Sequence, residues 1–272
     1  MKFVIVLFIG FICPPLLFSQ ISEIIPASTS IAQASVADTH SWSSFHNPAM
    51  LGYSTASELG MEVDNRFLIP ELSTQSFQYG FASRAVNAGV SFSRFGYSLY
   101  NEMLAGFCLA RNFSDKFSMG VGFNYYTAYY HSTHSYRGTF FPQIGLSVRF
   151  SPAFSLGFNT FNPFQTNIDQ AYVLKRIPSV YSLGTEYQFS PELAWHTQID
   201  KEISGGYRFA TGFGYRMLES LSVNVGGYAS QYLVPCLGFG VDAGALTLTL
   251  NCELHPLLGL NTMGGVKYRF KK

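Results

Sequence analysis

The feature that most constrains this chain is a two-residue alternation of side chains, which starts near residue 57 and continues almost to the end. In KFSMGVGFNYY (116–126), large apolar residues alternate with Ser, Gly and Asn, and SLGTEYQF (182–189) and LTLTLNCEL (246–254) repeat the pattern. Successive side chains of a β-strand point to opposite faces, so each segment predicts a strand with one apolar face and one small or polar face. A soluble β-sandwich would also alternate, so further features must decide between the two.

The lengths of the predicted strands favour a membrane barrel. Most are close to the roughly 9–11 residues of a tilted membrane-spanning strand, and longer than the usual globular strand of about five or six. The fourteen predicted strands cover residues 57–66, 74–83, 86–96, 100–111, 116–127, 139–150, 153–161, 179–189, 192–200, 206–216, 220–230, 234–242, 245–253 and 260–270.

The connections between these strands fall into two alternating sets. Every second one is tight, as around Ser114 and Ser190, whereas the other set includes the longer segments 128–138 and 162–178. Short periplasmic turns opposed to longer outer loops are typical of outer-membrane barrels. An even number of strands also returns both chain ends to the periplasmic side.

Composition supports the same fold class. The chain is 17% aromatic and only 12% charged, and after residue 20 it has no apolar run long enough for a spanning helix. A soluble domain so poor in charge would be sticky, but a barrel directs its apolar faces to lipid. The few Lys and Arg residues are scattered, which argues against nucleic acid as a partner. We therefore predict an all-β protein: an antiparallel transmembrane β-barrel of about 14 strands, with a short N-terminal hatch segment.

The N-terminus predicts export. Residues 1–19 combine an early basic residue, an apolar run and a small residue at Ser19, as in a cleaved secretory signal peptide. A retained membrane anchor and a lipoprotein modified at Cys13 are the alternatives. The rest divides into a hatch or periplasmic segment, 20–56, and the transmembrane barrel, 57–272. The expected location is the outer membrane of a Gram-negative-type cell.

Two regions resemble a known superfamily. ASVADTHSWSSFHNPAMLGY (34–53) resembles the N-terminal segment of FadL-type outer-membrane transporters of long-chain fatty acids, where an Asn-Pro-Ala turn precedes the first strand. The strand succession in 177–202 and 206–228 is similar to that of the PorV/PorQ group within this superfamily, some of whose members serve type IX secretion. The closing strand resembles the signal read by the barrel-assembly machinery, but the chain ends in two lysines instead of an aromatic residue.

The resemblance implies a hatch motif, Asn47, Pro48 and Ala49, within a segment folded into the periplasmic mouth. Barrel size makes this reasonable. Side chains can fill the lumen of an eight-stranded barrel, but a fourteen-stranded barrel is wider and leaves space that another segment can occupy. The alternative is that the segment is only a strap leading into the first strand.

By alternation, most ionisable groups of the barrel face inward. They could close the lumen with ion pairs and hydrogen bonds, or form a polar conduit or a site for a ligand headgroup. The predicted lumen polar network comprises Glu62, Asp64, Arg149, Glu186, His196, Asp200, Arg208, Arg216, Asp242, Glu253, Lys267 and Arg269.

No motif nominates an enzyme, a cofactor or a metal site. His131 and His134 are the only local histidine pair and lack a third nearby ligand. The GxG of GFGVDAG (238–244) has no following helix to bind a dinucleotide, and no GxSxG elbow is present. We expect no catalytic residues, no metal and no cofactor.

The functional prediction is a FadL-like passive channel for hydrophobic small molecules. The alternative is a PorV/PorQ-type protein-interaction component of type IX secretion or surface attachment. Apolar patches in FLIPEL (67–72) and LKRIPSVY (174–181) could collect a hydrophobic substrate or dock a protein. The expected partners are outer-membrane lipid, a hydrophobic small molecule or secretion-system proteins, and the assembly machinery during biogenesis.

Overall fold

The fold is known from a computed structural model, which describes residues 24–26, 31–39, 42–131, 134–170 and 173–270. The predicted signal peptide, residues 1–19, lies outside the described residues.

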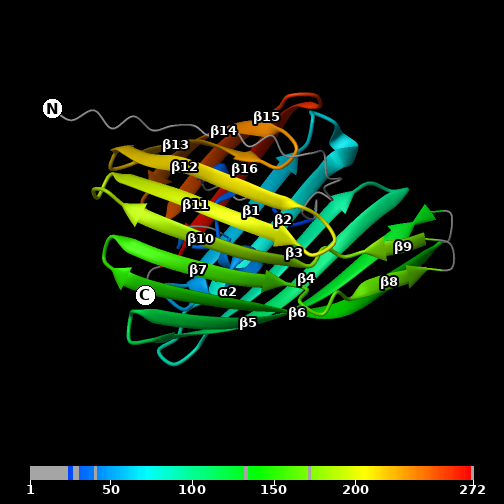
Figure 1. Ribbon diagram of the computed structural model, residues 1–272, viewed down its shortest axis with the longest axis horizontal. Helices are drawn as coiled ribbons and strands as arrows, with labels where there is room; N and C mark the ends of the chain where they lie inside the picture. Colours follow the sequence, from blue (N-terminus) through cyan, green and yellow to red (C-terminus); the bar gives the residue numbers. More distant parts are fainter. Residues whose placement is uncertain (1–23, 27–30, 40–41, 132–133, 171–172, 271–272) are drawn as a thin grey trace.

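Fourteen antiparallel strands close into one barrel, which confirms the predicted fold class (Figure 1). Each strand pairs with its neighbours in sequence, and β1 closes the ring against β16. The barrel strands are β1 (Glu58–Asn65), β2 (Ser73–Phe81), β3 (Asn87–Gly96), β4 (Tyr100–Phe113), β5 (Phe117–Tyr130), β6 (Ser135–Ser151), β7 (Phe154–Phe161), β10 (Val180–Gln188), β11 (Leu193–Glu202), β12 (Tyr207–Leu218), β13 (Leu221–Ala229), β14 (Leu233–Ala243), β15 (Leu246–His255) and β16 (Gly259–Arg269).

The seam between β1 and β16 defines the two ends of the barrel. Its register runs from Glu58 opposite Arg269 to Asn65 opposite Thr262, so the first strand begins where the last one finishes. We call this the terminal end and the opposite one the far end. The two longest connections, 66–72 and 162–179, both lie at the far end.

Burial follows the alternation that the sequence predicts. On β1, Glu62 and Asp64 are buried in the lumen, whereas Met61 and Val63 are about half exposed on the outer surface. The same contrast recurs on β15, where Leu248 and Leu250 are exposed. The outside of the barrel is therefore largely apolar, and polar side chains line its interior.

One predicted loop is wrong. Residues 128–138 are mostly strand, because β5 continues to Tyr130 and β6 begins at Ser135. Aromatic pairs stabilise this extension: the ring centroids of Tyr129 and Tyr136 are 4.8 Å apart, and those of Tyr100 and Tyr130 are 4.9 Å apart. Cross-strand ring packing thus favours continued pairing where the sequence had suggested a loop.

The other long connection is also more ordered than predicted. It contains a two-stranded hairpin of β8 (Asn167–Gln170) and β9 (Val173–Arg176), which pairs only with itself. Figure 1 shows this hairpin at the opposite end of the barrel from the C-terminus. The 3₁₀-helix η2 (Pro70–Leu72) lies in the connection between β1 and β2.

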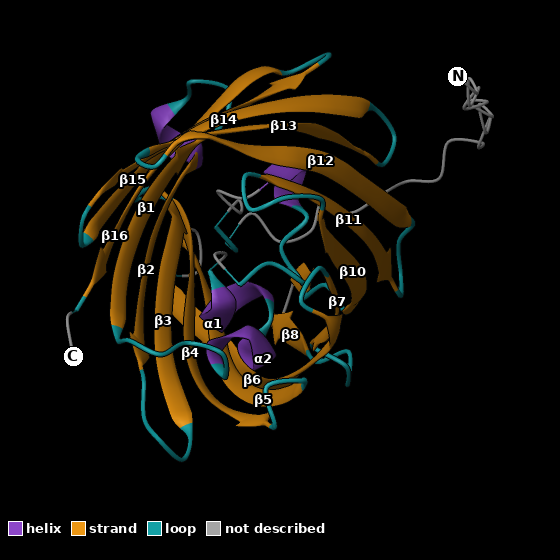
Figure 2. Ribbon diagram, turned by 90° about the vertical axis from the view of Figure 1, so that its left-hand side faces the viewer, coloured by secondary structure: helices purple, strands orange, loops and turns teal. Residues whose placement is uncertain are grey.

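Three short helices of the N-terminal segment lie inside the ring of strands (Figure 2). They are the 3₁₀-helix η1 (Ile31–Gln33) and the α-helices α1 (Ser43–His46) and α2 (Pro48–Leu51). Helix α2 packs against β3 to β6, and η1 packs against β12 to β14. In the described part of the chain, no helix has both the length and the apolar character needed to cross a membrane.

The lumen has two unlike halves. On the β3–β7 side it is filled by a hydrophobic core that includes Trp42 and Phe45 of the N-terminal segment and Ile168 of the β8–β9 hairpin. The rings of Phe141 and Phe161 meet edge-on there, with centroids 4.8 Å apart. The opposite half, formed by β11–β16 and β1, holds a cavity lined in part by charged side chains.

Candidate functional site

The Asn-Pro-Ala turn attaches the N-terminal segment to the barrel wall at β6. Asn47 is fully buried and caps α2, its side-chain oxygen accepting a hydrogen bond of 3.0 Å from the backbone N–H of Ala49. Its side-chain nitrogen donates to the carbonyl oxygens of Val36, at 2.7 Å, and of Leu146 on β6, at 3.3 Å. Pro48 stands at the first helical position, where its missing N–H costs no hydrogen bond.

Glycines on the barrel wall make room for this turn. A Cβ atom added to Gly120 would lie 2.5 Å from the carbonyl carbon of Pro48, and one added to Gly145 would lie 2.9 Å from the nitrogen of Ala49. Any side chain at either position would therefore collide with the backbone of α2. Gly212 and Gly226 leave similar space for η1. The described part of residues 31–51, which we call the hatch, therefore fits closely against the lumen wall.

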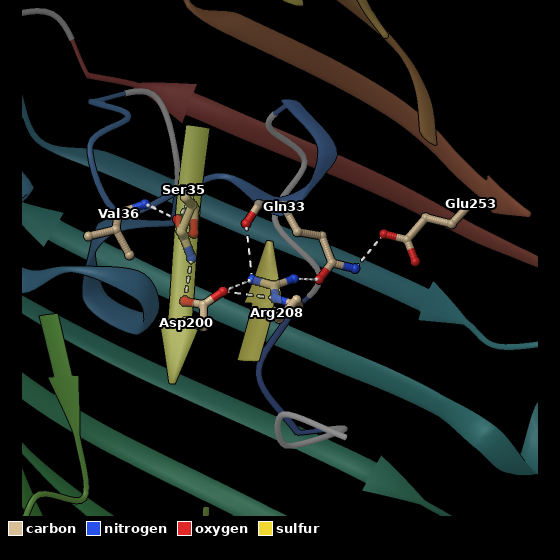
Figure 3. A network of polar contacts seen from close by, with 7 residues as sticks. Gln33, Ser35, Val36, Asp200, Arg208 and Glu253 are labelled. Atoms are coloured by element: carbon tan, nitrogen blue, oxygen red, sulfur yellow. Dashed lines mark hydrogen bonds and ion pairs between the residues drawn. The ribbon is translucent and has the colours of Figure 1, made fainter. Parts of the chain in front are cut away.

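An ion pair and an amide form a network across the other half of the lumen (Figure 3). The Nη2 and Nε atoms of Arg208 lie 2.8 Å and 2.9 Å from Oδ2 of Asp200. The Nη1 atom of the same guanidinium donates to the side-chain oxygen of Gln33 at 2.6 Å. The side-chain nitrogen of Gln33 donates in turn to a carboxylate oxygen of Glu253 on β15. Gln33 of the hatch thus links β12 to β15.

A second amide ties the hatch to the same network. The side-chain oxygen of Gln198 accepts hydrogen bonds from the backbone N–H groups of Ser35 and Val36, at 2.8 Å and 2.9 Å. Its nitrogen donates to Asp200 at 2.8 Å. Hatch backbone, Gln198 and the Asp200–Arg208 ion pair therefore form one connected network.

A cavity of about 370 Å³, which we call the vestibule, lies above this network at the far end. Gln33 and Arg208 lie in its floor, while Phe67, Tyr232 and Leu257 belong to the far-end connections around its rim. Its wall is thus apolar and aromatic toward the outside and charged toward the hatch.

The space narrows sharply on passing Gln33. A second, much smaller cavity of about 10 Å³ lies between η1 and the β13–β16 wall, where Asn224 and Asn251 line it. Gln33, Glu253 and Met263 line both cavities, so the hydrogen-bonded side chains of Gln33 and Glu253 lie between them. The backbone of Gln33 is in the left-handed region with φ 60°, as is that of Ala32 with φ 53°. Such conformations cost about 1–3 kcal/mol each and cluster at functional sites.

Not all predicted lumen residues enter this network. Arg149 stacks over the ring of Tyr53, 3.6 Å from its centroid, and Glu186 has Arg149 and Asp38 as charged neighbours. His196 is buried on β11. These side chains lie in the lumen away from the vestibule.

The β1–β16 seam carries a further group of predicted residues. Lys267 lies 5.6 Å from the ring centroid of Trp42 and 3.9 Å from the carboxylate of Glu58. Glu62 is buried near Lys267, while Arg269 is largely exposed.

Arg216 and Asp242 lie near the terminal end and are exposed as well. Asp242 accepts a hydrogen bond of 2.5 Å from the hydroxyl of Thr247. Neither residue lines the vestibule.

Three uncharged residues of the site were missed by sequence reasoning. Gln33 of the hatch accepts a hydrogen bond from Arg208, and Gln198 of the barrel accepts one from the hatch backbone. The hydroxyl of Tyr228 donates to Glu253 at 3.1 Å. None of the three carries a charge at neutral pH, and charge was the criterion for most of the predicted lumen network. The two-residue alternation places Gln198 and Tyr228 on inward faces of their strands, so it could have predicted them as lumen residues. Gln33 lies outside the strands, and no pattern in the sequence marks it.

The described residues contain no group of three His, Cys, Asp or Glu side chains arranged to hold a metal ion. The rings of His131 and His134 meet with centroids 4.6 Å apart at the far end. The described residues instead form a cavity large enough for a small solute, with a constriction beneath it.

No protein-family model matches the chain, and no curated protein matches its sequence. Solved structures do match its fold. The Pseudomonas putida toluene transporter TodX superposes with a TM-score of 0.65 at 11% identity, covering 91% of this chain and 97% of TodX. A Pseudomonas aeruginosa FadL homologue gives 0.66 at 10% identity, covering 91% and 100%. The CymD monoaromatic hydrocarbon channel gives 0.64 at 10% identity, covering 93% and 99%. The chain therefore has the barrel fold of these FadL-type channels, and at such low identity the likeness concerns the fold alone.

Proposed function

We propose that this chain is an outer-membrane β-barrel that lets hydrophobic small molecules pass through its lumen without an energy source. The observation that carries the proposal is the far-end vestibule of about 370 Å³, with its apolar rim and the hatch beneath it. Such a cavity can bind a small apolar molecule, and the hatch beneath it determines which molecules continue through the lumen.

The outer surface supports a place in a membrane. Alternate side chains that face outward are large and apolar, and Phe209, Phe213 and Leu250 are each about half exposed to solvent in the isolated chain. In water this would be a strongly adhesive surface, whereas in lipid it is the favourable one. With the chain ends on the periplasmic side, the vestibule opens to the outside of the cell.

The comparisons support the class of solute. Two of the similar structures are a toluene transporter and a monoaromatic hydrocarbon channel. The vestibule of this chain has aromatic rim residues, Phe67 and Tyr232, that would accept a ring-shaped apolar solute.

The test is uptake of radiolabelled toluene at low concentration by Gram-negative cells that lack other hydrocarbon channels, with and without this protein. Val234 is buried and lines the vestibule, so Val234→Trp should fill the cavity and reduce uptake several-fold. Val225 is 54% exposed on the outer face, so Val225→Trp is the matched control and should leave uptake unchanged.

Folding of each variant is checked by heat-modifiable gel mobility. Uptake equal to that of cells without the protein would overturn the proposal. Equal uptake by the Val234→Trp and Val225→Trp variants would show that any passage bypasses the vestibule.

The finer assignments remain separate predictions. Export by a cleaved signal peptide rests on the pattern of residues 1–19. A PorV/PorQ-type role in type IX secretion rests on the sequence resemblance. The connection between β7 and β8 carries Phe164, which is 77% exposed and could contact a protein partner. Co-purification of a stable partner in mild detergent, lost in a Phe164→Ser variant, would favour that alternative over passive transport.

A further inference from the structure

The vestibule carries an excess of negative charge. This inference rests on the proposed function, because it concerns the chemistry of the solute that the same cavity selects. The ionised groups lining the cavity are four carboxylates, Asp64, Asp200, Glu202 and Glu253, and two guanidinium groups, Arg66 and Arg208. A solute that carries its own carboxylate would enter a field of its own sign.

Two of these carboxylates are already well bound within the protein. Asp200 accepts from Arg208 and from Gln198, all at 2.8–2.9 Å. Glu253 accepts from Gln33, from the hydroxyl of Tyr228 and from the side-chain nitrogen of Asn261. Both groups belong to the closed floor of the vestibule.

Asp64 is different. It is only 2% exposed, on β1, and its Oδ2 atom lies 3.5 Å from Nε of Arg66. Its Oδ1 atom is buried and has no hydrogen-bond partner among the described residues. A buried acceptor left without a donor is destabilising, and more so when it is charged. A donor group on a solute in the vestibule would remove that cost.

The wall next to Asp64 suits an apolar body. Phe67, Leu257, Leu258 and Met263 line the same cavity, and both leucines are more than half exposed. The His255 ring lies between aromatic neighbours, 6.2 Å from the Phe67 centroid and 5.6 Å from that of Tyr232. Aromatic faces also attract organic ammonium groups, because the ring face carries partial negative charge.

We propose that the vestibule selects small amphiphilic amines, whose ammonium group donates to Oδ1 of Asp64 while their apolar body packs against the rim. The site prefers these cations to carboxylates of the same size. A neutral alcohol should bind between the two, because its hydroxyl can donate to Asp64 without the charge.

The experiment is calorimetric titration of the folded barrel in detergent at pH 7 with three probes that share one body: phenethylamine, 2-phenylethanol and 3-phenylpropanoate. The amine should bind at least tenfold more tightly than the carboxylate. In Asp64→Asn, which keeps the shape and removes the charge, amine affinity should fall at least tenfold, to near that of the alcohol. Asp242→Asn makes the same change outside the vestibule and should leave amine affinity unchanged.

Equal or tighter binding of the carboxylate, or undiminished amine binding by Asp64→Asn, would overturn the inference. Displacement of the amine by equimolar potassium chloride would also count against it, because a site for any small cation would not need the apolar wall. Toluene uptake separates this inference from the channel itself: uptake without amine preference defeats only the inference, and amine binding without uptake defeats only the channel.

Discussion

The side-chain amide of Asn47 donates a hydrogen bond of 2.7 Å to the carbonyl oxygen of Val36, eleven residues earlier in the chain. The same fully buried side chain caps α2 and reaches the β6 carbonyl of Leu146. One residue therefore joins two parts of the hatch to each other and to the barrel wall. This explains why an Asn-Pro turn, and not a simple linker, precedes the first strand.

Replacing Asn47 by Ala should loosen the hatch and leave the barrel intact. The variant loses the α2 cap and leaves the buried carbonyl of Val36 without its donor, a combined cost of about 2 kcal/mol or more. Hydrogen exchange of the amides in 42–51 should quicken at least tenfold, while exchange in the barrel strands stays unchanged.

The matched variant is Asn47→Asp, which keeps the acceptor for Ala49 but loses both donated bonds. It places a buried carboxylate oxygen against the carbonyl oxygens of Val36 and Leu146, so it should protect the α2 amides no better than Asn47→Ala does. Unaltered exchange in both variants would show that packing alone holds the hatch.

A methyl group on the barrel wall should disturb the hatch as strongly. In Gly145→Ala the new Cβ would lie 2.9 Å from the nitrogen of Ala49, in a wall that cannot yield without moving a strand. Overpacking of this kind costs about 1–3 kcal/mol. Gly264→Ala is the control, because no atom lies within 4 Å of its added Cβ. Faster proteolysis of the N-terminal segment in Gly145→Ala alone is the expected result, and equal proteolysis of both variants would contradict the fitted-hatch description.

Docking of the hatch should weaken in acid through His46. Burial, with Arg208 and Lys267 nearby, lowers the pKa of this imidazole to about 4. A released hatch would expose His46 and restore its ordinary pKa of about 6.5, so between these values the released form binds more protons. The contribution of His46 to docking is therefore complete above about pH 6.5 and is lost as the pH falls toward 4.

Hydrogen exchange of 42–51, corrected for its intrinsic pH dependence, measures this effect. Protection should be lower at pH 4.5 than at pH 7.5, and the difference should shrink in His46→Gln. An equal acid effect in His46→Gln would assign it to other groups.

The barrel was predictable from sequence because its cause is repetitive. Each strand carries its own two-residue pattern, and lipid outside and polar groups inside impose it fourteen times. The extension of β5 and β6 was not predictable in this way, since it depends on ring contacts such as Tyr129 with Tyr136 across two strands. Local alternation fades there, and only the paired structure shows why the ladder continues.

The site was predictable only in part, for a related reason. Alternation places Asp200, Arg208 and Glu253 inside, but which of them meet depends on strand register and on the path of the hatch. Gln33 has no periodic signal, because η1 is a single turn with a left-handed backbone. A functional residue of this kind is specified by the cavity around it and not by its own neighbours in sequence.

The contact between Gln33 and Glu253 gives the last prediction. Gln33 separates the vestibule from the small cavity beneath it, so Gln33→Ala should join the two and increase single-channel conductance in a planar bilayer several-fold. The change also frees Arg208 from its 2.6 Å bond to Gln33, while the Asp200–Arg208 pair keeps that guanidinium in place. Gln75 on β2 is exposed on the outer face, so Gln75→Ala is the matched control and should conduct like the unaltered protein. Equal conductance in the two variants would mean that the constriction lies elsewhere in the hatch, whereas a rise in Gln33→Ala alone would identify this single amide as what closes the lumen.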